Sequence, residues 1–123
     1  MKYFLAVDIG ASSGRHMLTH MEEDRMVLEE VHRFYNGMTE KNGHKIWDVD
    51  TLFEEIKIGM KKCASLGKIP ESMGIDTWAV DFVLLDKNGG RIGDAVAYRD
   101  ARTTGMDEGM PDCRREAYCK ESL

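Results

Sequence analysis

The expected fold is decided by residues 5–18, which read Leu-Ala-Val-Asp-Ile-Gly-Ala-Ser-Ser-Gly-Arg-His-Met-Leu. Tyr3 to Val7 is a run of aromatic and aliphatic residues and predicts a buried strand. The strand ends at the carboxylate of Asp8, which suits a water-bridged Mg²⁺. A second strand is predicted from Arg15 to Thr19. These two strands and the turn between them predict a β-hairpin.

The turn of this hairpin has the composition of an anion-binding loop. Gly10 and Gly14 bracket Ala11, Ser12 and Ser13, and such small residues let the backbone turn tightly and approach a ligand. Consecutive N–H groups at such a turn can bind an anion. The spacing matches neither the dinucleotide G-x-G-x-x-G pattern nor a Walker A loop, and turns also use Gly and Ser for conformational reasons. The residues alone therefore leave a purely structural turn as an alternative.

Strands continue after the hairpin. A polar turn at residues 21–24 and a strand at 26–34 complete an antiparallel meander, and residues 36–45 are expected to form a loop. His16 and His20 lie on one face of a predicted strand but about 13 Å apart at the usual rise per residue. We therefore expect them to be structural or surface residues rather than a pair of metal ligands.

One helix is predicted, with Asp50 as its N-cap and residues 51–66 as its body. Apolar residues at steps of three and four predict one buried stripe, made of Leu52, Ile56, Met60, Cys63 and Leu66. Gly67 is expected to end the helix. A strand over residues 72–78 follows, so that the helix forms a crossover between strands.

A second hairpin is predicted in the last third of the chain. Residues 80–85 and 91–98 flank the sequence Asp-Lys-Asn-Gly-Gly at 86–90, which has Asn-Gly at its centre. Beyond Thr103 the chain is rich in Gly, Met and charge, with a short helical segment expected at 114–120.

Composition excludes several classes of function. The 123 residues suffice for one small domain. A net charge of −5 without a Lys/Arg cluster argues against nucleic acid and anionic membranes as partners. No apolar run is long enough for a membrane span or a signal peptide, which favours a cytoplasmic location. Cys63, Cys113 and Cys119 form no C-x-x-C pair, so free thiols are expected.

A resemblance to a known family strengthens the interpretation as a phosphate site. Residues 8–15 resemble the first phosphate motif of the FGGY carbohydrate kinases, which belong to the actin-like and sugar-kinase ATPase superfamily. The resemblance continues in order through four further segments, at His32–Phe34, Trp47–Asp50, Gly74–Asp86 and Ala97–Thr103. It extends from Tyr3 to about Tyr118 and is strongest to the rhamnulokinase branch of the family.

The resemblance implies an α/β fold, namely part of a ribonuclease-H-like domain of the actin-like and sugar-kinase ATPase type. Its mixed sheet would contain a three-strand antiparallel meander, a crossover helix and an added hairpin. Residues 1–123 would form the incomplete N-terminal lobe of a two-lobed kinase. The family's general base would lie beyond Leu123, so we assign no catalytic residue, neither Asp76 nor Asp81, and expect the chain to be inactive alone.

The same resemblance implies ATP and Mg²⁺ as cofactors. The residues that would approach the ATP phosphates are Gly10, Ala11, Ser12, Ser13, Gly14 and Arg15. Asp8 would belong to the same cofactor-binding set and lie near Mg²⁺ or the transferring phosphoryl group. A structural ion pair with Asp8 is the alternative role for Arg15.

One wall of a sugar pocket is implied for Thr77, Trp78, Ala79, Asp81 and Arg99. Ala79 stands where the rhamnulokinase branch tends to have Gly, and its methyl group would approach the sugar. Trp78 would either stack on the sugar or fill the core. Asp81 and Arg99 would bind sugar hydroxyls or, alternatively, form a salt bridge that braces the hairpin.

The resulting hypothesis is ATP-dependent phosphorylation of a ketose, L-rhamnulose to L-rhamnulose 1-phosphate. Two alternatives remain at this point: half of a split kinase completed by a second chain, and a non-catalytic actin-like binding or regulatory module. Because a single strong helix is predicted, one sheet face should be exposed, and self-association is expected.

Overall fold

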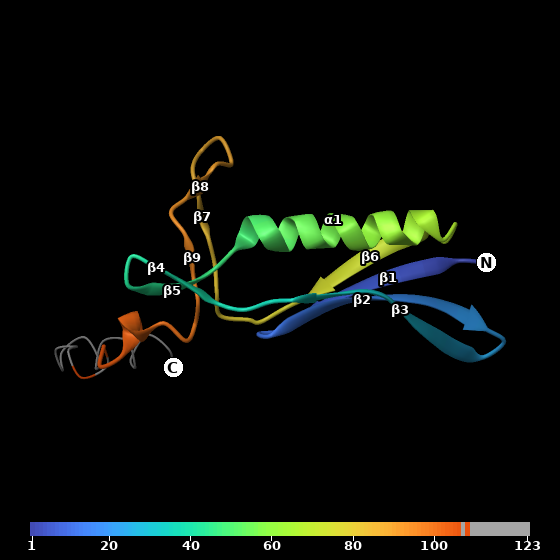
Figure 1. The fold of residues 1–123 in the computed structure, drawn as a ribbon, viewed down its shortest axis with the longest axis horizontal. Helices are drawn as coiled ribbons and strands as arrows, with labels where there is room; N and C mark the ends of the chain where they lie inside the picture. The colour runs from blue at the N-terminus through green and yellow to red at the C-terminus, as the bar shows by residue number, and fades with distance from the viewer. Residues whose placement is uncertain (107, 109–123) are drawn as a thin grey trace, which may run out of the picture.

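The computed structural model describes residues 1–106 and 108, and its main feature is a four-stranded mixed sheet (Figure 1). The strands of this sheet are β1 (Tyr3–Ile9), β2 (Ser13–Glu22), β3 (Arg25–Tyr35) and β6 (Pro70–Asp76). Their spatial order is β3-β2-β1-β6; β1, β2 and β3 form the predicted antiparallel meander, and β6 is parallel to β1. The expected α/β class is therefore confirmed.

The crossover between β3 and β6 contains helix α1 (Val49–Ser65). Its N-cap is Asp48, whose carboxylate accepts hydrogen bonds from the backbone N–H (3.0 Å) and the hydroxyl (2.8 Å) of Thr51. The predicted N-cap, Asp50, is wrong by two residues: it lies in the first turn, where its charge is favourable to the helix dipole.

The end of α1 is a Schellman motif, as the glycine after the helix suggested. Gly67 has φ = 68°, a left-handed conformation that favours glycine. Its N–H donates to the carbonyl of Ala64, and the N–H of Lys68 donates to the carbonyl of Cys63. Gly67 is thus confirmed as the residue that ends the helix.

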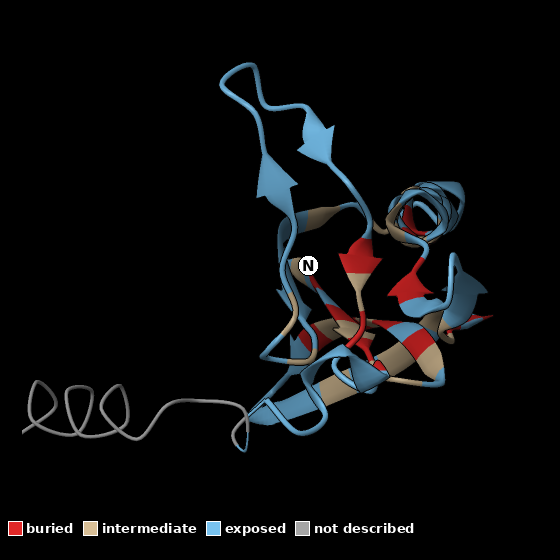
Figure 2. Cartoon of the chain, turned by 90° about the vertical axis from the view of Figure 1, so that its left-hand side faces the viewer, coloured by how far each residue is buried: buried red, intermediate tan, exposed pale blue. Residues whose placement is uncertain are grey.

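The core lies between α1 and the sheet (Figures 1 and 2). Alternate residues of β1 are buried there, together with side chains from β2, β3 and α1: Leu5, Val7, Ile9, Leu18, Phe34 and Cys63. The predicted helix stripe is wrong at Met60 and Leu66, which are exposed. Gly59 faces the sheet instead. The ring of His16 fills the space that a side chain at this position would need, since an added Cβ would lie 2.2 Å from Cδ2 of that ring.

His16 is a core residue, in agreement with its predicted structural role. Its side chain is fully buried, and Nε2–H donates to the carbonyl of Ile56 (3.2 Å). Nδ1 is buried without a partner, and desolvation lowers the pKa of His16 from its usual value, with the neighbouring His32 adding to that effect.

A second, smaller sheet replaces the loop predicted over residues 36–45. Strands β4 (Thr39–Lys41) and β5 (His44–Trp47) form a hairpin, and β9 (Ala95–Val96) pairs with β5. Asn42 (φ = 51°) and Gly43 (φ = 79°) both have positive φ, as a two-residue type I′ turn requires. The Asn-Gly pair was the signal that would have predicted this hairpin.

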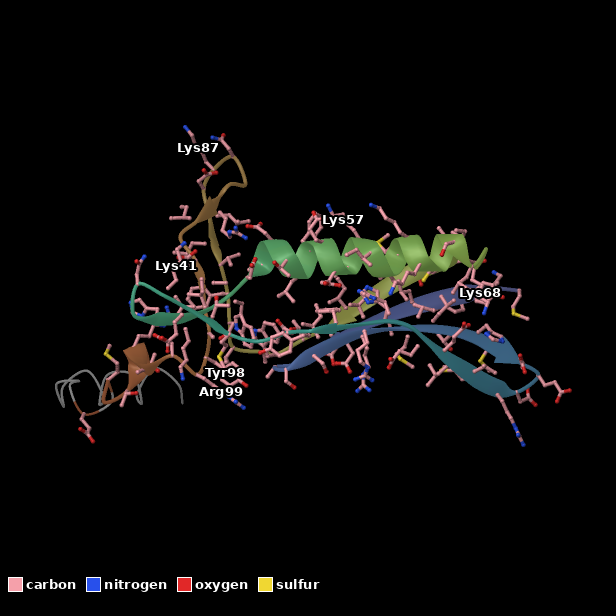
Figure 3. The ribbon with its side chains drawn as sticks, viewed as in Figure 1. Lys41, Lys57, Lys68, Lys87, Tyr98 and Arg99 are labelled. Atoms are coloured by element: carbon pink, nitrogen blue, oxygen red, sulfur yellow. The ribbon has the colours of Figure 1, made fainter. Side chains whose placement is uncertain are left out.

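The predicted second hairpin is an arm that projects from the molecule (Figures 1 and 2). Its strands, β7 (Leu84–Leu85) and β8 (Arg91–Ile92), are shorter than predicted, and Ala95–Val96 pairs with β5 instead. Asp86 stabilises the tip, because its carboxylate accepts hydrogen bonds from the backbone N–H groups of Asn88 and Gly90. Lys87 lies at that tip, far from the sheet (Figure 3).

Within residues 1–106, α1 is the one helix that covers the four-stranded sheet, and the 3₁₀ turn η1 (Ala101–Thr103) follows β9. Large apolar side chains remain exposed on the strands, among them Phe4, Met21, Met26, Leu28, Met73 and Ile75. Self-association stays a prediction. In the part that the structure describes, the model has no helix long and apolar enough to cross a membrane. The helical segment predicted at 114–120, Cys113 and Cys119 lie outside the described residues.

Candidate functional site

The parallel pairing of β1 and β6 brings the two predicted binding segments together. Asp8 pairs with Asp76 at the carboxyl ends of these neighbouring strands. The turn at residues 10–12 follows one strand, and the segment 77–81 follows the other. Ligands of open α/β sheets bind beyond the carboxyl ends of strands. The predicted phosphate turn and sugar wall therefore share one edge of the sheet.

The shape of the phosphate turn is fixed by hydrogen bonds that its backbone carbonyl groups accept. The N–H of Gly10 donates to the carbonyl of Ser13 (2.9 Å). Asn36 donates twice, from its backbone N–H to the carbonyl of Ser12 (3.0 Å) and from Nδ2 to the carbonyl of Gly10 (2.7 Å). No hydrogen bond among the described residues uses the N–H groups of Ala11 and Ser12. These two groups are thus available to an anion.

Asn36 is a residue that sequence reasoning missed. Its side chain is only 6% exposed although it follows an edge strand, and it contacts a turn 26 positions earlier in the chain. Antiparallel pairing of Ser13 with Tyr35 places it there. The resemblance did not include this position, and spacing alone gives no signal for such a contact.

Three of the predicted phosphate residues, Ser13, Gly14 and Arg15, lie in strand β2 rather than in the turn. Ser13 begins β2, and Gly14 pairs with Ile9 and Phe34 in the sheet. A Cβ on Gly14 would be 2.0 Å from the ring of Phe34. Core packing therefore explains the absence of a side chain at Gly14.

Asp8 and Arg15 form the ion pair that was the structural alternative for Arg15. The guanidinium Nε lies 3.0 Å from Oδ2 of Asp8, and both side chains are about half exposed. An exposed pair of this kind contributes only about 0–1 kcal/mol to stability, so ligand phosphate can replace it at low cost.

Asp76 provides a second carboxylate beside Asp8. Paired residues of neighbouring strands point to the same face, and these two follow that rule at the strand ends. Oxygen donors with room for water are the environment that Mg²⁺ prefers. The residues present therefore fit a hydrated Mg²⁺ next to the phosphate turn. Asp76 is a neighbour of this position, whereas sequence reasoning had placed it in the segment of the sugar wall and not near the metal.

One residue of the sugar wall, Trp78, stacks on Trp47, the last residue of β5. The rings of Trp47 and Trp78 are 4.0 Å apart between centroids and 25° from parallel. Nε1–H of Trp47 donates to Oδ2 of Asp81 at 2.5 Å. Trp78 also packs against both apolar clusters, so it is in part a core residue. Thr77 and Ala79 are exposed.

Arg99 does not form the salt bridge with Asp81 that was the alternative role for these two residues. Among the described residues, Asp81 forms its hydrogen bond with Trp47, and no ion pair joins it to Arg99. The guanidinium of Arg99 instead lies 5.4 Å from the centre of the Tyr98 ring, a cation–π arrangement. Figure 3 shows both side chains on the segment after β9.

A hollow of about 260 Å³ adjoins the wall, and polar side chains of Asp81, Tyr98, Asp100 and Arg102 contribute to its lining. Complete ligand pockets usually exceed about 300 Å³, so this hollow has the size of a partial pocket. Apolar residues, among them Val80, Phe82 and Ala97, complete the lining.

Asp100 fixes the segment that carries Tyr98 and Arg99. Its carboxylate accepts hydrogen bonds from the N–H of Lys45 (2.8 Å), from Nδ1 of His44 (3.0 Å) and from the N–H of Arg102 (3.1 Å). The bond from Lys45 is the largest cause, followed by His44, of a pKa of Asp100 lowered to about 2. The carboxylate therefore stays ionised and bound to β5 near neutral pH.

The fold is of the actin-like, sugar-kinase ATPase type. A solved xylulose kinase from Lactobacillus acidophilus superposes with a TM-score of 0.71 over 98% of this chain and 24% of that one, at 13% identity. At this level of identity the likeness shows the fold alone.

Sequence comparison gives the particular family. The model of the FGGY family of carbohydrate kinases, N-terminal domain, matches residues 3–121. The chain belongs to this family. It is 58% identical over 123 residues to a rhamnulokinase of Halalkalibacterium halodurans and 54% identical over 104 residues to one of Oceanobacillus iheyensis. The matches cover 100% and 85% of this chain but only 25% and 22% of those relatives, so the chain spans about a quarter of their length.

Proposed function

We propose that this chain is the N-terminal part of a rhamnulokinase, which transfers the γ-phosphoryl group of ATP to L-rhamnulose and forms L-rhamnulose 1-phosphate. The observation that carries the proposal is the shared sheet edge, where the turn at 10–12 and the wall at 77–81 follow neighbouring parallel strands. The identity to rhamnulokinases supports L-rhamnulose as the sugar.

In this proposal the chain contributes positioning and charge stabilisation, which dominate the catalysis of phosphoryl transfer. The N–H groups of Ala11 and Ser12 bind phosphate oxygens, and Arg15 adds a positive charge. Asp8 and Asp76 hold the water shell of Mg²⁺, which would supply neutralisation of the phosphate charge. Asp81 accepts a hydrogen bond from a sugar hydroxyl.

We propose further that the 123 residues do not perform the transfer by themselves. No side chain of this chain is assigned as the base that takes the proton of the attacking hydroxyl. The base would come from the other lobe of the kinase.

A chimeric enzyme tests the proposal. The matched segment of the Halalkalibacterium halodurans relative is replaced by this chain, and ATP-dependent formation of sugar phosphate is measured with L-rhamnulose, D-xylulose and glycerol. We expect the highest kcat/KM with L-rhamnulose. A chimera that folds and binds ATP but prefers another acceptor would refute the proposed substrate.

The same materials test the two other hypotheses. If mixing this chain with the remainder of the relative, as a separate polypeptide, restores turnover, the chain can act as half of a split kinase. If it binds neither L-rhamnulose nor ATP in the chimera, a non-catalytic module is favoured instead.

A further inference from the structure

We propose that Trp47 is a positioning residue for the sugar, one that acts through Asp81 and Trp78 without itself contacting the substrate. This inference rests on the proposed function. It assigns a role to the last residue of β5, which neither the sequence motifs nor the predicted sugar wall had given to it.

Trp47 is more deeply buried than Trp78 and Asp81, and unlike them it lies in a strand. It is 3% exposed, and it pairs with Ala95 in the second sheet. Trp78 is half-buried and Asp81 partly exposed, and both lie in the irregular segment between β6 and β7. A residue fixed by a sheet therefore supports two that no regular element holds.

The hydrogen bond from Trp47 fixes one oxygen of Asp81. Buried indole N–H groups need an acceptor, and Oδ2 of Asp81 is the acceptor at 2.5 Å. If Asp81 rotated away, this N–H would be left without its partner, at a cost in free energy. Asp81 is thus held in one orientation, with Oδ1 left for a sugar hydroxyl.

The stacking contact fixes the plane of Trp78 in the same way. The two rings are 4.0 Å apart, and both border the apolar side of the wall. Trp47 also belongs to the cluster against which Ala11 of the phosphate turn packs. One buried indole therefore contacts two of the sugar-wall side chains, those of Trp78 and Asp81, and shares a cluster with the phosphate turn.

The test uses the chimeric enzyme with Trp47→Phe, which keeps an aromatic ring for stacking but removes the N–H. We expect the KM for L-rhamnulose to rise about tenfold, the equivalent of one lost hydrogen bond, while the KM for ATP stays within about twofold. Trp47→Leu, which also removes the stack, should raise the sugar KM further.

The matched control is Ile46→Val, at the neighbouring buried position of β5. It lowers the melting temperature without touching the wall, so the KM for L-rhamnulose should not change. An equal rise in both variants would show that Trp47 has a merely structural role and would overturn the inference. So would an unchanged sugar KM in Trp47→Phe.

A measurement on the unsubstituted chimera covers the case in which Trp47→Phe does not fold. With ¹⁵N-labelled tryptophan, the indole N–H of Trp47 should exchange slowly with water, and its resonance, identified with the aid of Trp78→Phe, should shift on adding L-rhamnulose but not ATP. No shift at saturating sugar overturns the inference. An unsubstituted chimera inactive on L-rhamnulose refutes the proposed function itself, whereas an active one that fails these tests refutes only the role of Trp47.

Discussion

At the scale of single residues, the site depends on contacts that remove freedom from short segments. Asn36 binds two carbonyls of the phosphate turn, Asp100 accepts from two donors of β5 and one of η1, and Trp47 orients Asp81. None of these three was predicted as a site residue. Asn36 and Trp47 lie far along the chain from the segments that they hold, and Asp100 joins its own segment to the distant strand β5.

Asn36→Ala should loosen the phosphate turn. The substitution removes the 2.7 Å bond to the carbonyl of Gly10, and we expect a loss of about 1–2 kcal/mol of stability and a rise in the KM for ATP of about tenfold. Chemical unfolding and initial rates of the chimera measure both. Asn88→Ala, on the exposed arm, is the control. An ATP KM unaffected by Asn36→Ala would show that the turn holds its shape without this residue.

Gly14→Ala should destabilise the fold through packing. Its Cβ would lie 2.0 Å from the Phe34 ring, and overpacking of this kind costs about 1–3 kcal/mol. Gly74→Ala is the comparison, because its Cβ meets nothing within 4 Å. Phe34→Leu should recover part of the loss in the double variant. If Gly14→Ala melted like the wild type yet lost ATP binding, the glycine would serve the phosphate and not the core.

At the scale of elements, helix α1 is joined to the sheet by apolar packing and by a group of polar side chains. His32 donates from Nε2 to Glu55 (2.5 Å) and accepts at Nδ1 from Lys62 (2.8 Å). Its ring lies 5.4 Å from that of His16, which bonds to the carbonyl of Ile56. The side chain of His16 is therefore buried, and that of His32 largely buried, at the main helix–sheet contact, with Glu55 partly buried and Lys62 exposed beside them.

Acid should weaken this contact through His16. Burial lowers the folded-state pKa of His16 below about 6.5, its unfolded value, so below that pH the unfolded chain binds a proton that the folded chain does not. Stability is then complete above pH 6.5 and falls as the pH decreases towards the folded-state pKa. Urea unfolding at pH 7.5 and pH 5.5 measures the difference.

The control for that experiment is His16→Gln, which cannot titrate. Its stability should fall less between the two pH values than that of the wild type, while Glu55, Lys62 and His32 remain in place around it. Equal pH dependence in both proteins would assign the effect to those neighbours.

At the scale of the whole molecule, α1 covers one face of the mixed sheet within residues 1–106 (Figures 1 and 2). Apolar side chains remain exposed on the strands. β6 is an edge strand and pairs in parallel with β1. Sheets made of parallel strands are usually covered by helices on both faces. Exposed strand surface of this kind favours association between copies of the chain.

We expect the purified 123-residue chain to associate as its concentration rises. Met26 and Leu28 lie two apart on β3 and are both exposed, so replacing each by Lys should shift the sedimentation profile towards monomer. Lys57→Glu, on the outer side of α1 (Figure 3), changes charge without touching the strands and should leave association unchanged. A chain that is monomeric throughout contradicts the expectation.

The sequence by itself determined the local features: the meander, the turn after β1, the helix with Gly67 at its end, and the hairpin around Asp86. These depend on neighbours within a few residues, since strand alternation, turn conformation and capping act over that range. The sequence also indicated the family, because several motifs of the FGGY carbohydrate kinases occur in it in the right order. Two local predictions are wrong. The Asn42-Gly43 pair lies in a predicted loop although it is also a hairpin signal, and Asp50 is the predicted N-cap although Asp48 is an equally suitable residue two positions earlier.

Only the tertiary structure decided which distant residues meet. The parallel pairing of β1 with β6 put Asp76 beside Asp8, and the β5–β9 pairing placed Trp47, whose indole reaches Asp81, 34 positions away along the chain. The reason Gly14 and Gly59 lack side chains became evident in the same way, from the rings of Phe34 and His16. Such contacts depend on strand register and on the packing of elements against one another, and residue spacing along the chain does not encode either directly.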